Sequence, residues 1–275
     1  MNRIVAKEQF SENVFMFEIE APRIAKARKA GHFVIVRVDK NGERVPLTIA
    51  GSDITKGTIT LVVQRIGVST YKLAELGVGD CIEDVVGPLG RATKIEKQEG
   101  TILAAGGGVG VAPLLPIIEA HHNIGNRVVA VLAGRTKDLI ILEEQVRRVA
   151  DDVIIMTDDG SYGKKGLVTA GMEEVILREK VSEAVVIGPA IMMKFGALTT
   201  KKYDIPTVVS LNTIMVDGTG MCGACRVSVG GKTRFVCVDG PEFDAHQVDF
   251  DQMLKRMGGF RECEQSAFES YKTSK

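Results

Sequence analysis

The chain has 275 residues, of which 45% are hydrophobic, enough for one large domain or two to three ordinary ones. Lysine plus arginine (35) equals aspartate plus glutamate (35), so no net charge favours nucleic acid or an anionic membrane surface. Aromatic residues make up only 5% and tryptophan is absent, which argues against a surface that stacks bases.

Two segments bear on targeting. The N-terminal "MNRIVAKEQF" lacks the apolar core of a signal peptide. Residues 101–120 are almost uncharged and nearly long enough to span a bilayer, but they contain four glycines and two prolines. We therefore expect a buried strand, a glycine turn and a helix there, in a soluble, cytoplasmic protein.

Residues 1–97 are expected to form a small antiparallel β-barrel domain. Short β-branched runs are separated by Gly, Asn and Asp, and one helical stretch falls at 69–76. The predicted strands are 13–21, 32–39, 58–67 and 80–90.

Residues 98–210 have a different pattern, in which apolar runs alternate with helical stretches. Such alternation predicts βαβ units and a parallel sheet that is covered on both faces. The predicted strands are 101–106, 127–134, 152–159, 184–189 and 206–211, and the predicted helices include 112–122, 142–150 and 167–179. Residues 211–275 are expected to be a third segment, with cysteine-bearing turns followed by a polar helical tail.

Three cysteines lie close together in this third segment, at Cys222, Cys225 and Cys237. This grouping favours an intracellular metal or cluster site over a disulfide framework. A tetrahedral sulfur site needs a fourth ligand, and the other cysteines are distant in sequence. We interpret Cys81 as a buried strand residue and Cys263 as incidental.

The stretch "AAGGGVGVAPL" (104–114) carries glycines between a predicted strand and a predicted helix. Gly108 and Gly110 would let the backbone approach a phosphate, whose charge the helix N-terminus favours. Pro113 suits the first helical turn. A plain tight turn remains the alternative.

The stretch "ERVPLTIAG" (43–51) lies on a predicted barrel strand. Arg44 could pair with a diphosphate, and Thr48 could offer a hydroxyl to a flavin ring. The alternative is an exposed strand on which these residues have no ligand.

Together these stretches, in this order, resemble the ferredoxin–NADP reductase superfamily over about residues 1–210. The resemblance implies a flavin barrel followed by a nicotinamide domain, with Leu47 in place of the tyrosine that usually stacks on the flavin. The implied FAD contacts are Arg44, Val45, Pro46, Leu47, Thr48, Val62, Val63, Gln64, Gly67, Ser69 and Thr70. The implied nicotinamide contacts are Gly108, Gly110, Pro113, Gly134, Arg135, Asp158, Asp159, Gly160, Gly188 and Pro189.

The choice between NAD and NADP depends on the cations after the second strand of the nicotinamide domain. A 2′-phosphate needs cationic partners, and Arg135 with Lys137 is offset there by Asp138. We expect NAD, although Arg135 could equally be a solvated residue.

The cysteine segment after such a reductase resembles the branch that includes the dihydroorotate dehydrogenase electron-transfer subunit. That branch holds a 2Fe-2S cluster through Cys-x4-Cys-x2-Cys and a later Cys. The second, third and fourth positions match Cys222, Cys225 and Cys237, and the first falls on Asp217. One Asp with three Cys is similar to the small subunits of the NADH-dependent reduced ferredoxin:NADP oxidoreductases. In the remaining alternative, Asp217 caps the turn and the three thiols bind zinc.

The resemblance implies an electron-transfer subunit that exchanges hydride between NAD(H) and FAD and passes single electrons to a 2Fe-2S cluster. The cofactors carry the redox chemistry, so no acid–base catalytic residue is expected. The implied partner is a larger flavin and iron–sulfur subunit, where ferredoxin and NADP react in an electron-bifurcating heterodimer. Alternatives are a dihydroorotate dehydrogenase subunit, a sulfide dehydrogenase or glutamate-synthase-type reductase, and a non-enzymatic zinc-stabilised binding module.

Overall fold

Alternation of apolar and polar residues builds the N-terminal sheet. In the computed structural model, which describes residues 2–274, Phe17 and Ile19 of β2 point into the barrel and are fully buried. The seven antiparallel strands follow the order β6-β1-β2-β5-β4-β3-β7, which confirms the expected antiparallel barrel. The strands are β1 (Asn2–Ser11), β2 (Val14–Glu20), β3 (Phe33–Arg37), β4 (Arg44–Asp53), β5 (Thr58–Gln64), β6 (Cys81–Ile82) and β7 (Asp84–Leu89), with helices α1 (Pro22–Ala27) and α2 (Val68–Glu75).

Cys81 is not the buried residue that the sequence indicated. It does lie on a strand, the short edge strand β6, but its side chain is exposed. Successive strand residues face opposite sides, and Ile82 rather than Cys81 takes the buried side, with 0% exposure.

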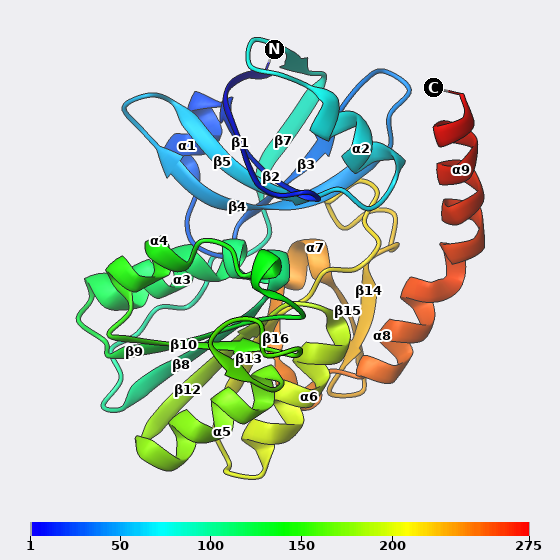
Figure 1. Cartoon of the computed structure of the whole chain (residues 1–275). Coiled ribbons are helices and arrows are strands. Elements are labelled where there is room, and N and C mark those ends of the chain that lie inside the picture. Colours follow the sequence, from blue (N-terminus) through cyan, green and yellow to red (C-terminus); the bar gives the residue numbers. More distant parts are fainter. Residues whose placement is uncertain (1, 275) are drawn as a thin grey trace.

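Strand–helix alternation builds the second sheet, below the barrel in Figure 1, in the order β11-β10-β9-β8-β12-β13-β16. Every neighbouring pair is parallel except β13 with β16. Helices α3 and α4 cover the face toward the barrel, and α5 and α6 cover the other face (Figure 1). The elements are β8 (Thr101–Gly107), η1 (Gly108–Gly110), α3 (Val111–Asn123), β9 (Val128–Gly134), η2 (Lys137–Leu139), α4 (Glu143–Val149), β10 (Asp152–Thr157), β11 (Lys164–Lys165), α5 (Val168–Arg178), β12 (Val181–Ile187), α6 (Ala190–Lys201) and β13 (Thr207–Ser210).

The apolar stretch 101–120 folds as expected, into the buried strand β8, the turn η1 and most of α3. Across residues 2–274, no helix has the length and apolar character needed to cross a membrane.

The C-terminal segment packs beside both sheets. Its strand β16 pairs with β13 and so extends the second sheet, while β14 and β15 form a separate hairpin. The last helix, α9, runs alongside the barrel (Figure 1), where Phe268 meets Tyr71 of α2 edge to face at 4.6 Å. The elements are β14 (Arg226–Val229), β15 (Lys232–Phe235), α7 (Val236–Asp239), β16 (Glu242–Asp244), η3 (Ala245–Gln247), α8 (Phe250–Met257), η4 (Gly258–Phe260) and α9 (Arg261–Thr273).

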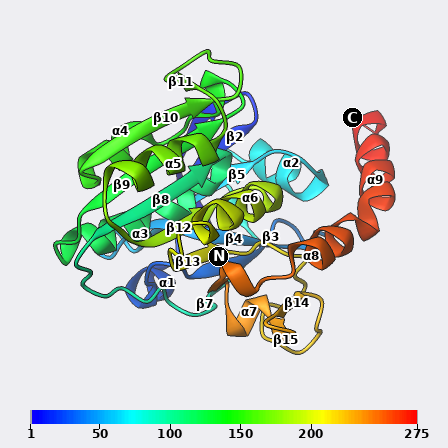
Figure 2. The same ribbon diagram turned by 90° about the horizontal axis from the view of Figure 1, so that it is seen from below.

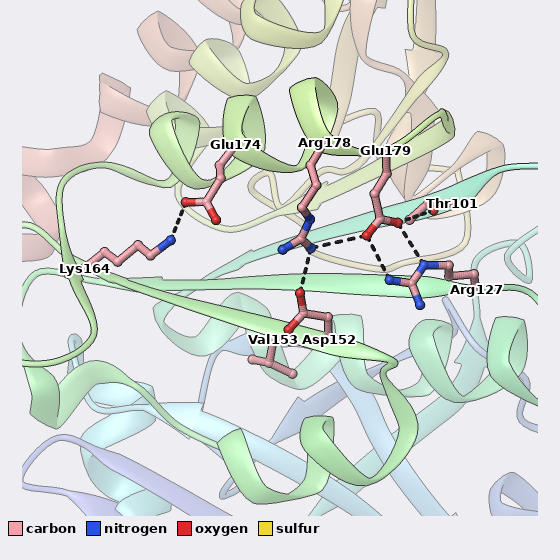
Figure 3. A network of polar contacts seen from close by, with 8 residues as sticks. All are labelled: Thr101, Arg127, Asp152, Val153, Lys164, Glu174, Arg178 and Glu179. Carbon is pink, nitrogen blue, oxygen red and sulfur yellow. Dashed lines mark hydrogen bonds and ion pairs between the residues drawn. The ribbon is translucent and has the colours of Figure 1, made fainter.

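A polar network ties the C-terminal end of α5 to the amino ends of the parallel strands (Figure 3). Glu179 accepts two hydrogen bonds from Arg127, both 2.8 Å, and one from Thr101 at 2.7 Å. Arg178 lies 2.6 Å from Asp152 and 3.3 Å from Glu179. The network therefore fixes the sheet edge opposite to the carboxyl ends of the strands.

We predict that Glu179→Gln weakens folding in a pH-dependent way. The hydrogen bond from Arg127 is the main reason that the pKa of Glu179 falls to about 2. Because its folded pKa is depressed, the stabilisation is complete above the unfolded pKa of about 4.3 and disappears as pH falls through the folded pKa. Arg127 is half exposed, so we expect a loss of about 1 kcal/mol at pH 7 that vanishes near pH 2.

Urea denaturation followed by circular dichroism at several pH values measures this difference. The matched control is Glu144→Gln, because Glu144 is 87% exposed and lies 3.8 Å from Arg148. An equal loss in both variants, or a loss that does not depend on pH, would contradict the prediction.

Candidate active site

The candidate flavin strand β4 has two different faces. Its partner β3 aligns Phe33 with Thr48 and Ile35 with Pro46, so these four side chains share one face. Val45 and Leu47 take the opposite face and pack against the barrel core. Arg44 continues the outward face and is exposed, with no ion pair or hydrogen bond in the part of the chain that the structure describes. The proposed Arg44, Pro46 and Thr48 contacts are thus brought together on one face.

The N-terminus of α2 lies beside the start of this strand. Ser69 is 8% exposed, and its Oγ donates to Glu43 Oε2 at 3.5 Å, a weak contact that places a carboxylate at the helix N-terminus. Helix N-termini attract anions, so this carboxylate occupies the position that suits a phosphate. Arg44 directly follows Glu43, and its guanidinium is a donor that suits a diphosphate, whereas a phosphate bound at the α2 N-terminus would displace the Glu43 carboxylate.

The other proposed flavin contacts have identifiable local roles. Thr70 Oγ1 accepts from the backbone N–H groups of Ile66 and Gly67, both at 3.0 Å, and so caps α2. Val62 packs with the cluster of buried residues that includes α3, whereas Val63 faces the barrel core and is 1% exposed. Gln64 is half-buried on the same side as Val62.

The proposed nicotinamide residues gather at the carboxyl edge of the parallel sheet. The register places Gly106 beside Ile187 and Gly134 beside Thr157, so the turns that follow four strands meet there. The N–H of Asp158 donates to the carbonyl of Gly134 at 3.1 Å, which joins two of these turns. Ligands of open parallel sheets bind at this edge. The residues located there are Gly108, Gly110, Pro113, Gly134, Arg135, Asp158, Asp159, Gly160, Gly188 and Pro189.

Gly108 and Gly110 are small for different reasons. A Cβ on Gly110 would collide with the carbonyl of Ile187 and lie 2.7 Å from Gly188 Cα, so close packing of the turn on the next strand requires this glycine. Gly108 has φ +54° and no atom within 4 Å of a built Cβ. The open space that a phosphate could approach is therefore at Gly108.

The four candidate cluster ligands form two pairs. Asp217 Oδ1 lies 3.0 Å from Cys222 Sγ, and Cys225 Sγ lies 3.3 Å from Cys237 Sγ. Cys222 is exposed, whereas Cys225 and Cys237 are each 2% exposed. Two such pairs suit a binuclear cluster, in which each iron takes two protein ligands.

The two oxygens of Asp217 have separate contacts. Oδ2 accepts from Thr219 Oγ1 at 2.7 Å and from the Met221 N–H at 3.2 Å, while Oδ1 faces the Cys222 thiol. These hydrogen bonds, with the Cys222 thiol first, hold the pKa of Asp217 well below its usual range. Burial, the Cys225 thiol and the charge of Asp217 together raise the pKa of Cys237 to about 12. One carboxylate can therefore cap the turn and still present its other oxygen to iron.

The cluster loop packs directly on the barrel. A Cβ on Gly218 would lie 2.8 Å from Ile35 Cγ1 and 2.9 Å from Leu89 Cδ1. Ile35 shares a hydrophobic cluster with Cys225 and Cys237. The outward face of β3–β4 thus touches the cluster loop, while β4 contacts α3 and β5 contacts η1 on the nicotinamide side.

A second contact region secures the cluster segment to the linker after the barrel. Thr93 Oγ1 donates to Glu242 Oε1 at 2.6 Å, and the Arg91 N–H donates to the Gly240 carbonyl at 2.7 Å. Burial raises the pKa of Glu242 to about 7. The linker, β16 and the turn that carries Cys237 are therefore held together.

Three residues of this region, Phe33, Ile35 and Glu43, were not predicted from the sequence. Phe33 and Ile35 have the pattern of ordinary barrel core residues, and only the packing of Gly218 against Ile35 shows that this face meets the cluster loop. Glu43 directly precedes Arg44, so an acidic residue beside a proposed phosphate contact was a usable signal.

Two family descriptions match the chain. An oxidoreductase FAD-binding domain matches residues 2–93, and the iron–sulfur cluster binding domain of dihydroorotate dehydrogenase B matches residues 212–249. These matches cover the barrel and the loop that carries Asp217 and the three cysteines.

The chain is similar to several proteins over most of its length. A Thermotoga maritima homologue of the dihydroorotate dehydrogenase B (NAD(+)) electron transfer subunit is 45% identical, covering 98% of this chain and 95% of that protein. The corresponding subunit of Desulforamulus reducens is 32% identical over 90% of this chain and 96% of its own length. An uncharacterized Clostridium beijerinckii protein is 46% identical, covering 95% and 91% of the two chains.

A solved structure of the NADH-dependent reduced ferredoxin–NADP oxidoreductase, studied for flavin-based electron bifurcation, has a similar chain. The two superpose with a TM-score of 0.93 at 44% identity and 98% coverage of each chain. A cytochrome b5 reductase domain from Ulva prolifera nitrate reductase, at 20% identity and TM-score 0.59, shares the fold over 73% of this chain and 91% of its own. The chain belongs to the family of dihydroorotate dehydrogenase B electron-transfer subunits and their homologues, oxidoreductase subunits that join a ferredoxin–NADP reductase fold to an iron–sulfur cluster binding domain.

Proposed function

We propose that this chain exchanges hydride between NAD(H) and FAD and relays single electrons through a 2Fe-2S cluster to a larger flavin and iron–sulfur subunit. The observation that carries this proposal is the position of the outward β3–β4 face, with the nicotinamide turn on one side and the cluster loop on the other. Bound FAD would accept two electrons together and release them one at a time, which the fold alone cannot do.

The residues of the chain contribute binding and placement. Arg44 and the N-terminus of α2 would hold the diphosphate of FAD, and Thr48 lies on the face that the ring would cover. Gly108 would admit the phosphates of the dinucleotide at the carboxyl edge of the sheet. Asp217, Cys222, Cys225 and Cys237 would hold the cluster, the first two at the surface and the last two buried.

The larger partner is proposed by analogy with the similar proteins, which are electron transfer subunits or part of a bifurcating oxidoreductase. Ferredoxin and NADP would react on that partner, in a heterodimer. A dihydroorotate dehydrogenase partner is the second candidate, because the cluster domain matches that family. We propose NAD for this chain, since only Arg135 and Lys137 offer positive charge after β9 and Asp138 offsets them.

For FAD binding, we predict that Arg44→Ala lowers flavin affinity while the fold survives, because the Arg44 side chain is exposed and forms no ion pair or hydrogen bond with the described residues. A charge-assisted hydrogen bond contributes about 1.5–3 kcal/mol, or roughly ten- to a hundredfold in affinity. Flavin absorbance after gel filtration measures retention. Arg23→Ala, another exposed barrel arginine, is the control. If both variants retain the same amount of flavin, Arg44 is not in the site.

For the nicotinamide turn, we predict that Gly108→Ala raises the Michaelis constant for NADH at least tenfold with bound FAD unchanged. The added methyl group would enter the open space at the sheet edge. Gly231→Ala is the matched control, since Gly231 also has positive φ (+72°) and open surroundings but lies on the β14–β15 turn. Equal Michaelis constants in the two variants would remove Gly108 from the site. Gly110→Ala is instead expected to lower the stability of the fold, because the alanine Cβ would collide with the backbone of Ile187 and Gly188.

For the fourth ligand, we predict that Asp217→Asn loses the cluster or makes it labile. An asparagine can still accept the Met221 N–H and cap the turn, but its neutral oxygen is a poor ligand for ferric iron. Asp217→Cys should keep a 2Fe-2S cluster with changed EPR g-values and a lower reduction potential, because thiolate donates more electron density. Cys225→Ala should lose the cluster.

Thr219→Ala is the control, because it removes one hydrogen bond to Asp217 without removing a donor of the proposed set. Iron content, EPR and NADH-dependent flavin reduction are measured in each variant, and flavin reduction should persist in all. An unchanged EPR signal and potential in Asp217→Asn would show that Asp217 only caps the turn. Zinc in place of iron in the native chain would overturn the redox function.

A further inference from the structure

A small pocket lies between the β14–β15 hairpin and helix α8, next to the cluster loop. It has a volume of about 240 Å³. Figure 2 shows the hairpin and α8 on the same side of the molecule, and α8 contacts β14. Its lining contains two guanidinium groups, an amide and a hydroxyl, and no acidic side chain. The lining residues are Arg226, Val227, Thr233, Gln252 and Arg256.

The cluster loop orients both arginines. Arg226 Nη1 donates to the Gly223 carbonyl at 3.0 Å, and Arg256 Nη2 donates to the Ala224 carbonyl at 3.2 Å. Each guanidinium has five N–H donors, so most remain available. Neither arginine has an ion pair within residues 2–274, unlike Arg127 and Arg178. Two oriented guanidinium groups without a counter-charge are suited to bind a carboxylate or another oxyanion.

The pocket is next to the exposed side of the cluster site. Gly223 and Ala224 separate Cys222, which is exposed, from Cys225, which is 2% exposed. Electrons leave most readily where a cluster is nearest the surface, which here is the edge with Asp217 and Cys222. Whatever fills the pocket therefore lies beside this edge.

The surroundings favour a protein over a free anion. The hairpin and α8 carry five basic side chains that form no ion pair in the described part of the chain: Arg226, Lys232, Arg234, Lys255 and Arg256. On the cluster loop, Met221 is 89% exposed and Val216 is 51% exposed. An inorganic anion would bury neither apolar side chain, whereas a protein surface can cover both.

We propose that this pocket binds a carboxylate side chain of an acidic partner protein and so docks that partner at the Asp217–Cys222 edge. The inference deepens the proposed function, because it assumes that electrons leave the chain at this edge. The docking surface is defined by the pocket together with the exposed Met221 and Val216.

The test uses the full chain with FAD and cluster bound, and a fluorescein-labelled hexaglutamate peptide as the probe. Fluorescence anisotropy measures its affinity at low salt. Arg226→Gln and Arg256→Gln should each weaken binding at least tenfold. Arg234→Gln, which removes the same charge from the same hairpin outside the pocket, should weaken it less than threefold. Equal losses in all three variants would overturn the proposal, because the attraction would then be diffuse.

A further variant tests the pocket without removing the hydrogen bonds from the two arginines to the cluster loop. Gln252→Glu leaves both arginines in place and puts a carboxylate on the pocket wall, so it should also weaken peptide binding at least tenfold. Unchanged peptide binding in Gln252→Glu would overturn the proposal.

A titration with inorganic phosphate, with chloride at equal ionic strength as the control, distinguishes a site for a free anion from a site for a protein carboxylate. Tighter binding of phosphate than of the peptide would show a small-anion site and overturn the docking proposal, as would absence of peptide binding. Iron content, EPR and NADH-dependent flavin reduction are measured in the same samples. If the native chain has no iron, no EPR signal and no NADH-dependent flavin reduction, the proposed function is refuted. If it has all three but does not bind the peptide, only the docking site is refuted.

Discussion

Close packing of the cluster loop on the barrel is the constraint on which the rest of the structure depends. Gly218 has φ +77°, and a Cβ there would meet Ile35 and Leu89 at less than 3 Å. This contact brings Asp217 to the outward face of β3, whose neighbour β4 carries Thr48 on the same face. Two parts of the chain almost 170 residues apart in sequence therefore lie side by side.

The parallel sheet completes this arrangement from the other side. Its carboxyl edge comes near the barrel at η1, which contacts β5, while α3, which follows η1, packs on β4. The opposite edge is held by charge pairs around Glu179 and carries none of the proposed binding residues. Charged side chains thus gather at one edge of the sheet and the glycine-rich turns at the other, which is the edge where ligands of open parallel sheets bind.

The four proposed cluster ligands differ in their exposure to solvent. Cys225 and Cys237 are buried in the hydrophobic cluster shared with β3, whereas Cys222 is exposed and Asp217 is half-buried. A binuclear cluster held by these residues would have one ligand pair in the protein interior and the other nearer the surface. Arg226 of β14 and Arg256 of α8 both donate hydrogen bonds to the same loop, so a charge bound beside them would act electrostatically on a cluster held there.

Local patterns in the sequence were sufficient for the order of the sheets and the turn at 106–110, because alternation and glycine position act within a few residues. The proposed set of four cluster ligands came from the resemblance to a known family. Local patterns could not predict three other features. These are the exposure of Cys81, the different roles of Gly108 and Gly110, and the pairing of Asp217 with Cys222. Each depends on which distant backbone lies opposite, and only the packed tertiary structure decides that contact.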